Sequence, residues 1–193
     1  MNCLFGVDKR AGGEIRLNGK DISPRSPLDA VKKGMAYITE SRRDNGFFPN
    51  FSIAQNMAIS RSLKDGGYKG AMGLFHEVDE QRTAEAQREL LALKCHSVNQ
   101  NITELSGGNQ QKVLISKWLC CHPEVIIFDE PTRGIDVGAK AEIYKVMRQL
   151  ADDGKVILMV SSELPEIITV CDRIAVFCEG RLTQILTNRD DMS

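Results

Sequence analysis

Residues 105–111 read LSGGNQQ and residues 125–130 read VIIFDE, and these two segments decide the fold of the chain. The glycine pair lets the backbone approach an anion closely, and a helix that opens there directs unpaired N–H groups and its positive end at that anion. An apolar strand that ends in two carboxylates can hold Mg²⁺ and a water molecule. Together the two segments predict one half of an ATP site in an α/β domain.

A motif that such a site normally needs is missing. No G-x-x-x-x-G-K-[ST] run, whose amides and lysine hold the β- and γ-phosphates, occurs in the sequence. We therefore expect an ATPase domain that starts just after the loop that would grip its own nucleotide. Hydrogen bonds to charged groups are worth roughly 1.5–3 kcal/mol each, so losing several of them should weaken nucleotide binding by orders of magnitude.

The composition limits the class of protein. A chain of 193 residues with 42% hydrophobic content can bury one substantial core. Its 25 basic and 26 acidic residues give a net charge of −1, which provides no broad electrostatic footprint for nucleic acid. The apolar runs are far shorter than the roughly 20 residues that span a bilayer, and the amino end lacks the pattern of a signal peptide. We expect a cytoplasmic protein whose six scattered cysteines are reduced and bind no metal.

Hydrophobic patterns predict the order of the elements. Helices and strands alternate after the glycine-rich motif, which favours a parallel α/β sheet. The expected elements there are a helix over 110–121, a strand over 125–129, a helix over 137–152, a strand over 156–161, a helix over 164–170, a strand over 173–178 and a hairpin strand over 181–186. Before the motif we expect a strand over 14–20, a short helix from 26 to 33, a strand over 35–38 and a polar loop over 39–46.

The stretch from Phe51 to Leu93 differs in character from the rest of the chain. Apolar residues recur at helical spacing from Ile53 to Ala58, and a long charged helix is expected over about 77–93. This pattern predicts a helical subdomain of about residues 51–105, inserted into the α/β domain.

The motifs resemble those of a known family. The order and spacing of LSGGNQQ, the acidic strand and PTRGID at 131–136 closely resemble the signature motif, Walker B strand and D-loop of ATP-binding-cassette (ABC) ATPases. Residues 106–112, 131–137 and 160–166 further resemble the carboxy-terminal cassette of the double-cassette ATPases that energise bacterial monosaccharide importers. The resemblance covers the chain from Met1 to about Leu186. It implies a partial P-loop NTPase core over 1–193 with a parallel sheet, a helical subdomain insert and short antiparallel β elements.

The resemblance also implies roles for individual residues. Asp129 would act on the Mg²⁺ shell, through water, and Glu130 would polarise the water that attacks the γ-phosphate. The signature segment would bind, in trans, the γ-phosphate of a nucleotide held by the opposite cassette. The signature residues concerned are Ser106, Gly107, Gly108, Asn109 and Gln110, and the D-loop residues are Gly134 and Asp136.

Two positions depart from ordinary cassettes. Glu40 stands where the Q-loop usually has glutamine, and Ser162 stands at the position of the switch histidine. Serine cannot supply the long, basic imidazole that contacts the γ-phosphate. Glu40 places a carboxylate near phosphates unless Mg²⁺ or a basic neighbour offsets it. Arg42 and Arg43 are nearby, but we expect them in a solvated loop, and we expect this half's own site to hydrolyse ATP weakly.

Cofactors, partners and location follow from the same resemblance. It implies ATP and Mg²⁺, a membrane permease, the amino-terminal cassette of the parent chain or a second copy, and indirectly a periplasmic sugar-binding protein. The location would be cytoplasmic, peripheral on the inner face of the plasma membrane. The insert would dock on the permease, although its charged residues fit a solvated helix face equally well.

The expected function is to couple ATP binding and hydrolysis to monosaccharide uptake, with the isolated chain inactive. Two alternatives stay open. One is a non-transport ABC ATPase that acts on DNA ends, ribosomes or iron–sulfur assembly; the near-neutral charge and the lack of coiled-coil heptads disfavour the first two. The other is a non-catalytic interaction or regulatory fragment.

Overall fold

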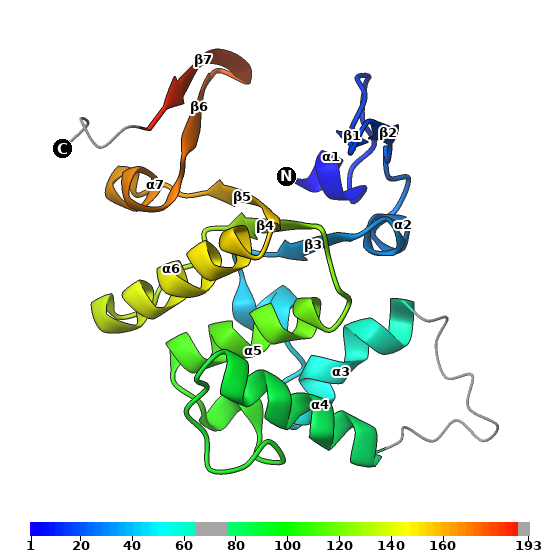
Figure 1. Ribbon diagram of the computed structural model, residues 1–193, viewed down its shortest axis with the longest axis vertical. Helices are drawn as coiled ribbons and strands as arrows, with labels where there is room; N and C mark the ends of the chain where they lie inside the picture. The colour runs from blue at the N-terminus through cyan, green and yellow to red at the C-terminus, as the bar shows by residue number, and fades with distance from the viewer. Residues whose placement is uncertain (65–76, 189–193) are drawn as a thin grey trace.

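The computed structural model of the chain describes residues 1–64 and 77–188, and the side chains of residues 43, 44 and 77–79 are not part of that description. A small sheet lies at the centre of the molecule (Figure 1). Helices α5 and α6 lie on one side of the sheet, and the hairpins β1–β2 and β6–β7 lie on the other. The central sheet carries the acidic strand, so it positions the candidate site.

The central sheet has three parallel strands in the order β3-β4-β5, with β3 at Met35–Ile38, β4 at Val125–Asp129 and β5 at Val156–Val160. Strands buried on both faces read as continuous apolar runs, and β4 does so until Asp129. Helix α6, at Val137–Asp152, connects β4 to β5. Its buried face packs on the sheet together with Phe128 and Ile115. The predicted parallel sheet is therefore confirmed for these strands.

Strand β6, at Arg173–Cys178, is part of the hairpin that the sequence predicts at this end of the chain. It follows α7, at Leu164–Val170, and pairs with β7, at Arg181–Thr187, in an antiparallel hairpin. It is not hydrogen-bonded to β5. The turn has positive φ angles at Glu179 (48°) and Gly180 (75°), the backbone that tight hairpins favour. The predicted hairpin is therefore confirmed, whereas β6 does not extend the parallel sheet beyond β5.

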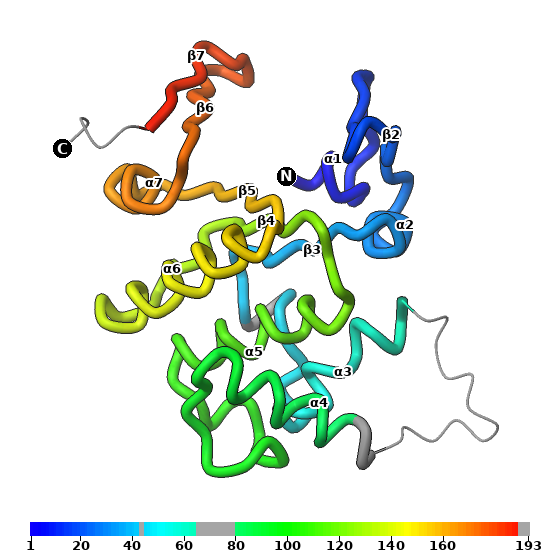
Figure 2. The backbone as a smooth tube through the Cα atoms, in the orientation of Figure 1, coloured from blue at the N-terminus to red at the C-terminus, as the bar shows by residue number. Residues whose placement is uncertain are grey.

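The helical part of the chain has its own buried cluster. Helices α3 (Ile53–Lys64), α4 (Glu77–Leu90) and α5 (Gly107–Leu119) and the short η2 (Ile102–Glu104) surround it. Ile53, Met57 and Leu114 are among its members. The backbone trace leaves β3, enters this unit and returns through α5 to β4 (Figure 2). Within the described residues, no helix is both long and apolar enough to cross a bilayer.

Helix α5 belongs to both packing units. Val113 and Leu114 face the helical cluster, whereas Ile115 belongs to the cluster beneath the sheet. The helix is buried along most of its length. Its start, at the glycine-rich motif, is therefore held in a fixed place relative to the acidic strand.

The first part of the chain is largely as predicted. It comprises α1 at Asn2–Phe5, the hairpin of β1 (Arg16–Leu17) and β2 (Lys20–Asp21), and α2 at Pro27–Lys32. Ser26 caps α2, because its Oγ accepts a hydrogen bond of 3.2 Å from the amide of Asp29. The expected loop over 39–46 instead contains a single π-helical turn, η1, at Arg42–Gly46. The amide of Phe47 closes this turn by donating to the carbonyl of Arg42.

Candidate functional site

The glycine-rich motif forms the amino end of α5. Ser106 is the N-cap residue, but its side chain makes no capping bond to the backbone. Its Oγ instead accepts a hydrogen bond of 2.9 Å from Nδ2 of Asn109. The first amides of a helix have no intrahelical acceptor, and here the serine does not occupy them. Together with the positive end of the helix dipole, they fit an anion such as a phosphate.

Two side chains of the motif tie it to neighbouring backbone. Oδ1 of Asn109 accepts a hydrogen bond of 3.0 Å from the amide of Lys94, and Nε2 of Gln110 donates one of 3.3 Å to the carbonyl of Ile102. Gln110 is buried. Within the predicted set, Asn109 and Gln110 therefore hold the motif in place, while Ser106 remains exposed to solvent.

Both glycines stand where a side chain would collide with a neighbour. A Cβ on Gly107 would lie 2.8 Å from Nη1 of Arg42, and a Cβ on Gly108 would lie 2.6 Å from Cβ of Ala139. The second contact arises because α5 crosses α6 closely at this point. The glycine pair is thus needed for packing as well as for access of an anion.

Asp129 ends strand β4 and is partly buried. The hydroxyl of Tyr37, on β3, donates a hydrogen bond of 2.6 Å to its Oδ2. Burial and the bond to Asp129 raise the pKa of Tyr37 above its usual value, so the phenol stays a donor at neutral pH. Tyr37 and Asp129 line a pocket of about 460 Å³ that also includes Asn2 and Glu40. Asp129 is thus held at the edge of a polar space.

Glu130 follows in a strained backbone conformation. Its φ angle is 49°, in the left-handed region that non-glycine residues rarely adopt. Its amide donates to the carbonyl of Val160 at 2.9 Å, which fixes the turn against β5. Its Oε2 accepts a hydrogen bond of 3.2 Å from Oγ of Ser162. The structure therefore brings the predicted water-polarising carboxylate and the predicted switch position into contact.

Glu40 has a basic neighbour, Arg133, that the sequence did not predict. Its carboxylate forms an ion pair with Arg133, from the segment after β4. Both side chains are about half exposed or more, so the pair contributes little to stability. It does offset the charge of Glu40. Arg133 belongs to the motif PTRGID. The sequence does not show that it lies close to Glu40, because the two residues are far apart in the chain.

Arg42 does not lie in a solvated loop, so that expectation is wrong. Its Nη1 donates a hydrogen bond of 2.6 Å to the carbonyl of Gly107. Its Nη2 donates to the carbonyls of Arg133 and Gly134, at 3.3 Å and 3.1 Å. Arg42 therefore joins turn η1 to both the signature segment (residues 105–111) and the D-loop (residues 131–136). The side chain of Arg43 lies outside the described residues.

The D-loop leads into α6. Gly134 has a φ angle of 67°, which favours glycine, and Asp136 is the N-cap residue of α6. Its Oδ1 accepts a hydrogen bond of 2.9 Å from the amide of Ala139. The two predicted D-loop residues thus shape the turn and start the helix that packs against Gly108.

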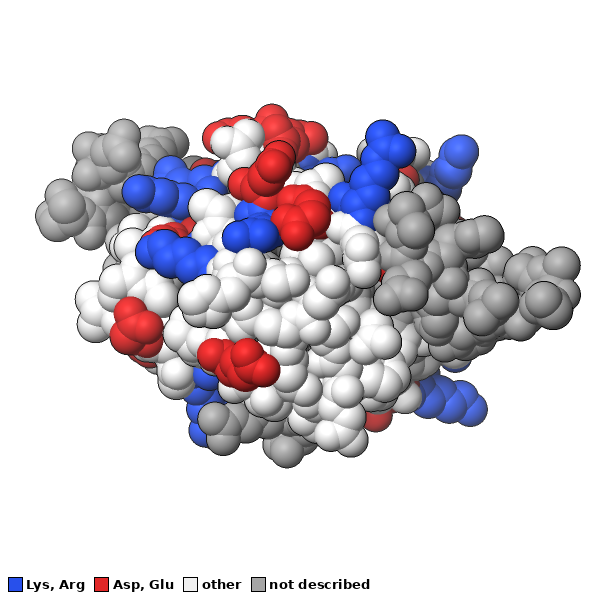
Figure 3. Space-filling model, turned by 90° about the horizontal axis from the view of Figure 1, so that it is seen from below, with Lys and Arg blue, Asp and Glu red and all other residues white. Residues whose placement is uncertain are grey.

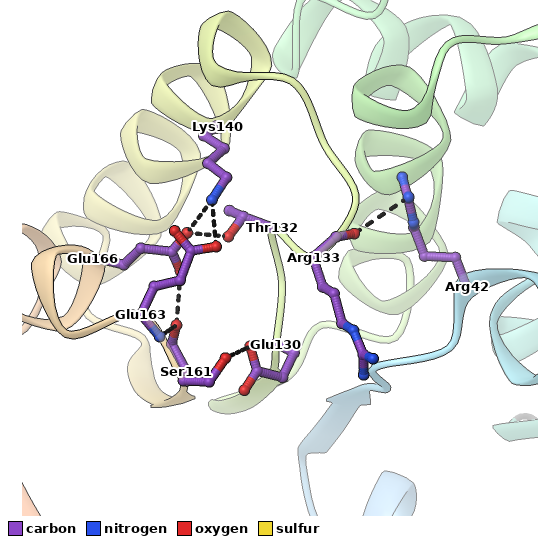
Figure 4. Close-up of polar contacts among 9 residues, drawn as sticks. Arg42, Glu130, Thr132, Arg133, Lys140, Ser161, Glu163 and Glu166 are labelled. Atoms are coloured by element: carbon purple, nitrogen blue, oxygen red, sulfur yellow. Dashed lines mark hydrogen bonds and ion pairs between the residues drawn. The ribbon is translucent and has the colours of Figure 1, made fainter.

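A buried carboxylate, which the sequence analysis also missed, connects the D-loop to α7. Glu166 is 4% exposed. Burial tends to raise its pKa, but hydrogen bonds from surrounding hydroxyls and an ammonium outweigh burial and hold that pKa below its usual value. Figure 4 shows Glu166 with Thr132, Lys140 and Ser161. The donors are Thr132, Lys140, Tyr144 and Ser161.

The described residues contain no group of three or more histidine, cysteine or acidic side chains that could enclose a metal ion. Mg²⁺ usually keeps several waters and binds one or two carboxylates together with substrate phosphates. The carboxylate of Asp129 lies beside a polar pocket that Asp8 and Glu40 also line, which fits that arrangement. The residues are thus compatible with Mg²⁺ when it arrives with a nucleotide.

Comparisons with known proteins identify the family. The family model for the ABC transporter matches residues 1–133. The chain is 99% identical to the D-allose import ATP-binding protein AlsA of Escherichia coli (strain K12), over all of this chain and 38% of that protein. It is 44% identical to a ribose import ATP-binding protein RbsA of Bacillus cereus, again over all of this chain and 38% of the relative. The chain therefore spans well under half the length of these curated relatives.

Solved structures agree on the fold. A dimeric ATP-binding cassette MJ0796, in a post-hydrolysis state with bound ADP and Pi, has a TM-score of 0.77 at 21% identity, over 97% of this chain and 78% of that one. The ATP-binding cassette MJ1267 of an ABC transporter has a TM-score of 0.80 at 21% identity, over 97% and 74% of the two chains. The predicted α/β fold of an ABC ATPase is confirmed. The chain belongs to the ABC transporter family.

Proposed function

We propose that the chain is the signature-bearing part of the ATPase subunit of a monosaccharide importer, and that the sugar is D-allose. The observation that carries this proposal is the 99% identity, over the whole chain, to a protein named for D-allose import. The residues of the site contain nothing that encodes the sugar. The parent protein couples ATP binding and hydrolysis to uptake.

The signature segment serves the ATP site of the opposite cassette. The uncapped amino end of α5 supports this role, because Ser106 and the amides of Gly107 and Gly108 can bind a γ-phosphate. The sequence has no phosphate loop to hold that nucleotide itself. The opposite cassette, either the amino-terminal cassette of the parent or a second copy, supplies the loop.

The chain's own half-site is the weaker one. Mg²⁺, when bound with ATP, neutralises charge that develops on the phosphates. Asp129 would hold a water of the Mg²⁺ shell, and Glu130 would polarise the water that attacks the γ-phosphate. Ser162 bonds to Glu130 and offers no imidazole for the γ-phosphate. This half therefore hydrolyses ATP slowly, and the isolated chain is inactive.

The helical unit is the surface for the membrane permease. Phe48 is 47% exposed and stacks on Phe51 at a centroid distance of 5.2 Å. Seen from this end of the molecule, the centre of the surface is largely uncharged and the charged side chains gather toward its rim (Figure 3). An exposed aromatic side chain and a largely uncharged surface are both features of docking sites. The subunit then sits peripherally on the inner face of the plasma membrane, and it meets the periplasmic sugar-binding protein only indirectly.

One experiment tests the transport function. The full-length double-cassette protein is reconstituted with its permease and the periplasmic binding protein, and ATP hydrolysis is measured with D-allose, ribose or no sugar. We expect stimulation by D-allose above both controls. Equal hydrolysis under all three conditions, with no sugar uptake, would contradict a role in import and favour the non-transport alternative.

A second experiment tests the roles of the chain alone. The purified chain is titrated with Mg-ATP, with and without the upstream phosphate-loop segment restored. We expect saturable binding only with that segment. Tight binding by the chain alone would mean that another element replaces the loop. Co-purification of the chain with permease, without hydrolysis in any pairing, would support the regulatory alternative instead.

A further inference from the structure

The side chain of Arg42 connects two segments that the ATP site needs in register. Its guanidinium donates to the carbonyl of Gly107 in the signature segment and to those of Arg133 and Gly134 in the D-loop (Figure 4 shows the bond to Arg133). We propose that Arg42 is a positioning residue that sets the spacing between these segments, so that the signature amides reach the partner's γ-phosphate. This inference rests on the proposed function of the signature segment.

The geometry requires the fork of an arginine. One nitrogen bonds to Gly107 at 2.6 Å, and the other reaches the two D-loop carbonyls at 3.3 Å and 3.1 Å. Charged donors make the stronger hydrogen bonds, and a planar guanidinium fixes their directions. A lysine has one ammonium nitrogen on a flexible chain, so it cannot take the place of both guanidinium nitrogens and donate to both segments with the same geometry.

The carbonyl of Gly107 lies on the first residue of α5, so its position sets where the phosphate-facing amides of that turn lie. Gly107 also has to be glycine for the contact, because a Cβ there would be 2.8 Å from Nη1 of Arg42. On the other segment, Gly134 leads to Asp136, which starts α6. Arg42 thus joins the start of one helix to the turn that begins the next.

Turn η1, which carries Arg42, is itself fixed to α5 at its other end. Nζ of Lys117 donates to the carbonyl of Gly46, and a Cβ on Gly46 would lie 2.8 Å from Cδ1 of Leu114. Burial lowers the pKa of Lys117 to about 8. Turn η1 therefore contacts α5 at both of its ends, through Arg42 and through Gly46.

The ion pair of Glu40 places the Q-loop position in the same arrangement. Glu40 pairs with the side chain of Arg133, whose carbonyl accepts from Arg42. Two side chains of residues 40–42 therefore contact the D-loop, the carboxylate of Glu40 and the guanidinium of Arg42. Arg42 adds the bond to Gly107, which carries the connection on to the signature segment.

The test compares Arg42→Gln and Arg42→Lys in the full-length protein assembled with its permease, by steady-state ATP hydrolysis and thermal unfolding. We expect Arg42→Gln to lower kcat by about 10- to 100-fold, because small misplacements at a site cost this much. KM for ATP should stay within about twofold, since the opposite cassette holds the nucleotide. Arg42→Lys should lie between Arg42→Gln and the unaltered protein.

Two further variants separate the possible outcomes. Arg16→Gln removes an exposed arginine from hairpin β1–β2 and should leave kcat and KM unchanged. Ser106→Arg tests the proposed function itself. Suppose that Ser106→Arg loses hydrolysis while Arg42→Gln keeps a kcat within about twofold of the unaltered protein. This result would overturn the positioning role and leave the proposed function standing. Full hydrolysis in Ser106→Arg would overturn both.

Misfolding does not leave the inference untested. If Arg42→Gln fails to assemble, Arg42→Lys decides, because lysine keeps the charge and most of the stem. An unchanged melting temperature with a clearly lowered kcat supports the positioning role. If kcat of Arg42→Lys equals that of the unaltered protein, the two-nitrogen geometry of the guanidinium is not needed, and the positioning role is overturned.

Discussion

Oγ of Ser162 donates a hydrogen bond of 3.2 Å to Oε2 of Glu130. The serine at the switch position thus contacts the carboxylate expected to polarise water. A histidine at that position would have the reach and the basic nitrogen to contact a γ-phosphate; serine has neither. The contact gives a structural reason why this half of the protein is expected to be the slow one.

Glu130→Gln in the full-length protein should lower turnover by less than about threefold, because hydrolysis at the other site continues. General bases contribute about 10²–10⁴-fold where they act, so the equivalent change in the amino-terminal cassette should be far more damaging. Both variants are compared by steady-state ATP hydrolysis. Near-complete loss of turnover in Glu130→Gln would sink the assignment of this half as degenerate.

Gly108→Ala should destabilise the fold by about 1–3 kcal/mol, since its Cβ would lie 2.6 Å from Cβ of Ala139. Ala139→Gly removes the opposing methyl group. The loss of unfolding free energy in the double variant should therefore be smaller than the sum of the losses in the two single variants, as measured by denaturant unfolding. Simple additivity would show that the close crossing of α5 and α6 is not what requires the glycine.

Tyr37→Phe removes the hydroxyl that bonds to Asp129 at 2.6 Å. The free energy of unfolding should fall by about 1.5 kcal/mol, because the lost bond has a charged acceptor. A double-mutant cycle with Asp129→Asn isolates the pair. A coupling energy near zero would mean that Tyr37 does not hold this carboxylate.

Glu166→Gln should lower the free energy of unfolding by about 2 kcal/mol at pH 7, since it weakens several charge-assisted bonds. The pKa of Glu166 is held below its usual 4.5 in the folded protein, so its contribution is present above that pH and is lost as the pH falls through the lower, folded value. The difference between the unaltered protein and Glu166→Gln should therefore shrink in acid. Thermal unfolding between pH 3 and 7 checks this, and a difference that does not change with pH would contradict it.

The sequence predicts those parts of the fold that depend on local patterns. The apolar strand over 125–129, the helix over 137–152 and the short helix after residue 26 all form as expected. The hairpin of β6 and β7 also follows from a local signal, the Glu179–Gly180 turn, whereas the sequence does not show that β6 stays outside the parallel sheet.

The contacts that organise the site join residues far apart in the chain. Arg42 and Gly107 are 65 positions apart, and Tyr37 and Asp129 are 92 apart. From sequence alone, a charged segment such as 39–46 is predicted to be a solvated loop, because the residues that it contacts are not known. The sequence therefore predicts residues for the candidate site but not the contacts of Arg42, Tyr37 and Glu166, whose partners become visible only in the folded chain.

The central claim is that the signature segment completes the ATP site of the opposite cassette. The most direct test compares the same substitution in the two cassettes. Ser106→Arg is made in the full-length protein, and the equivalent serine of the amino-terminal cassette is changed to arginine in a second variant; ATP hydrolysis is then measured for both. Our account predicts that Ser106→Arg abolishes hydrolysis and that the amino-terminal lesion lowers it only modestly. Equal or reversed effects would contradict it.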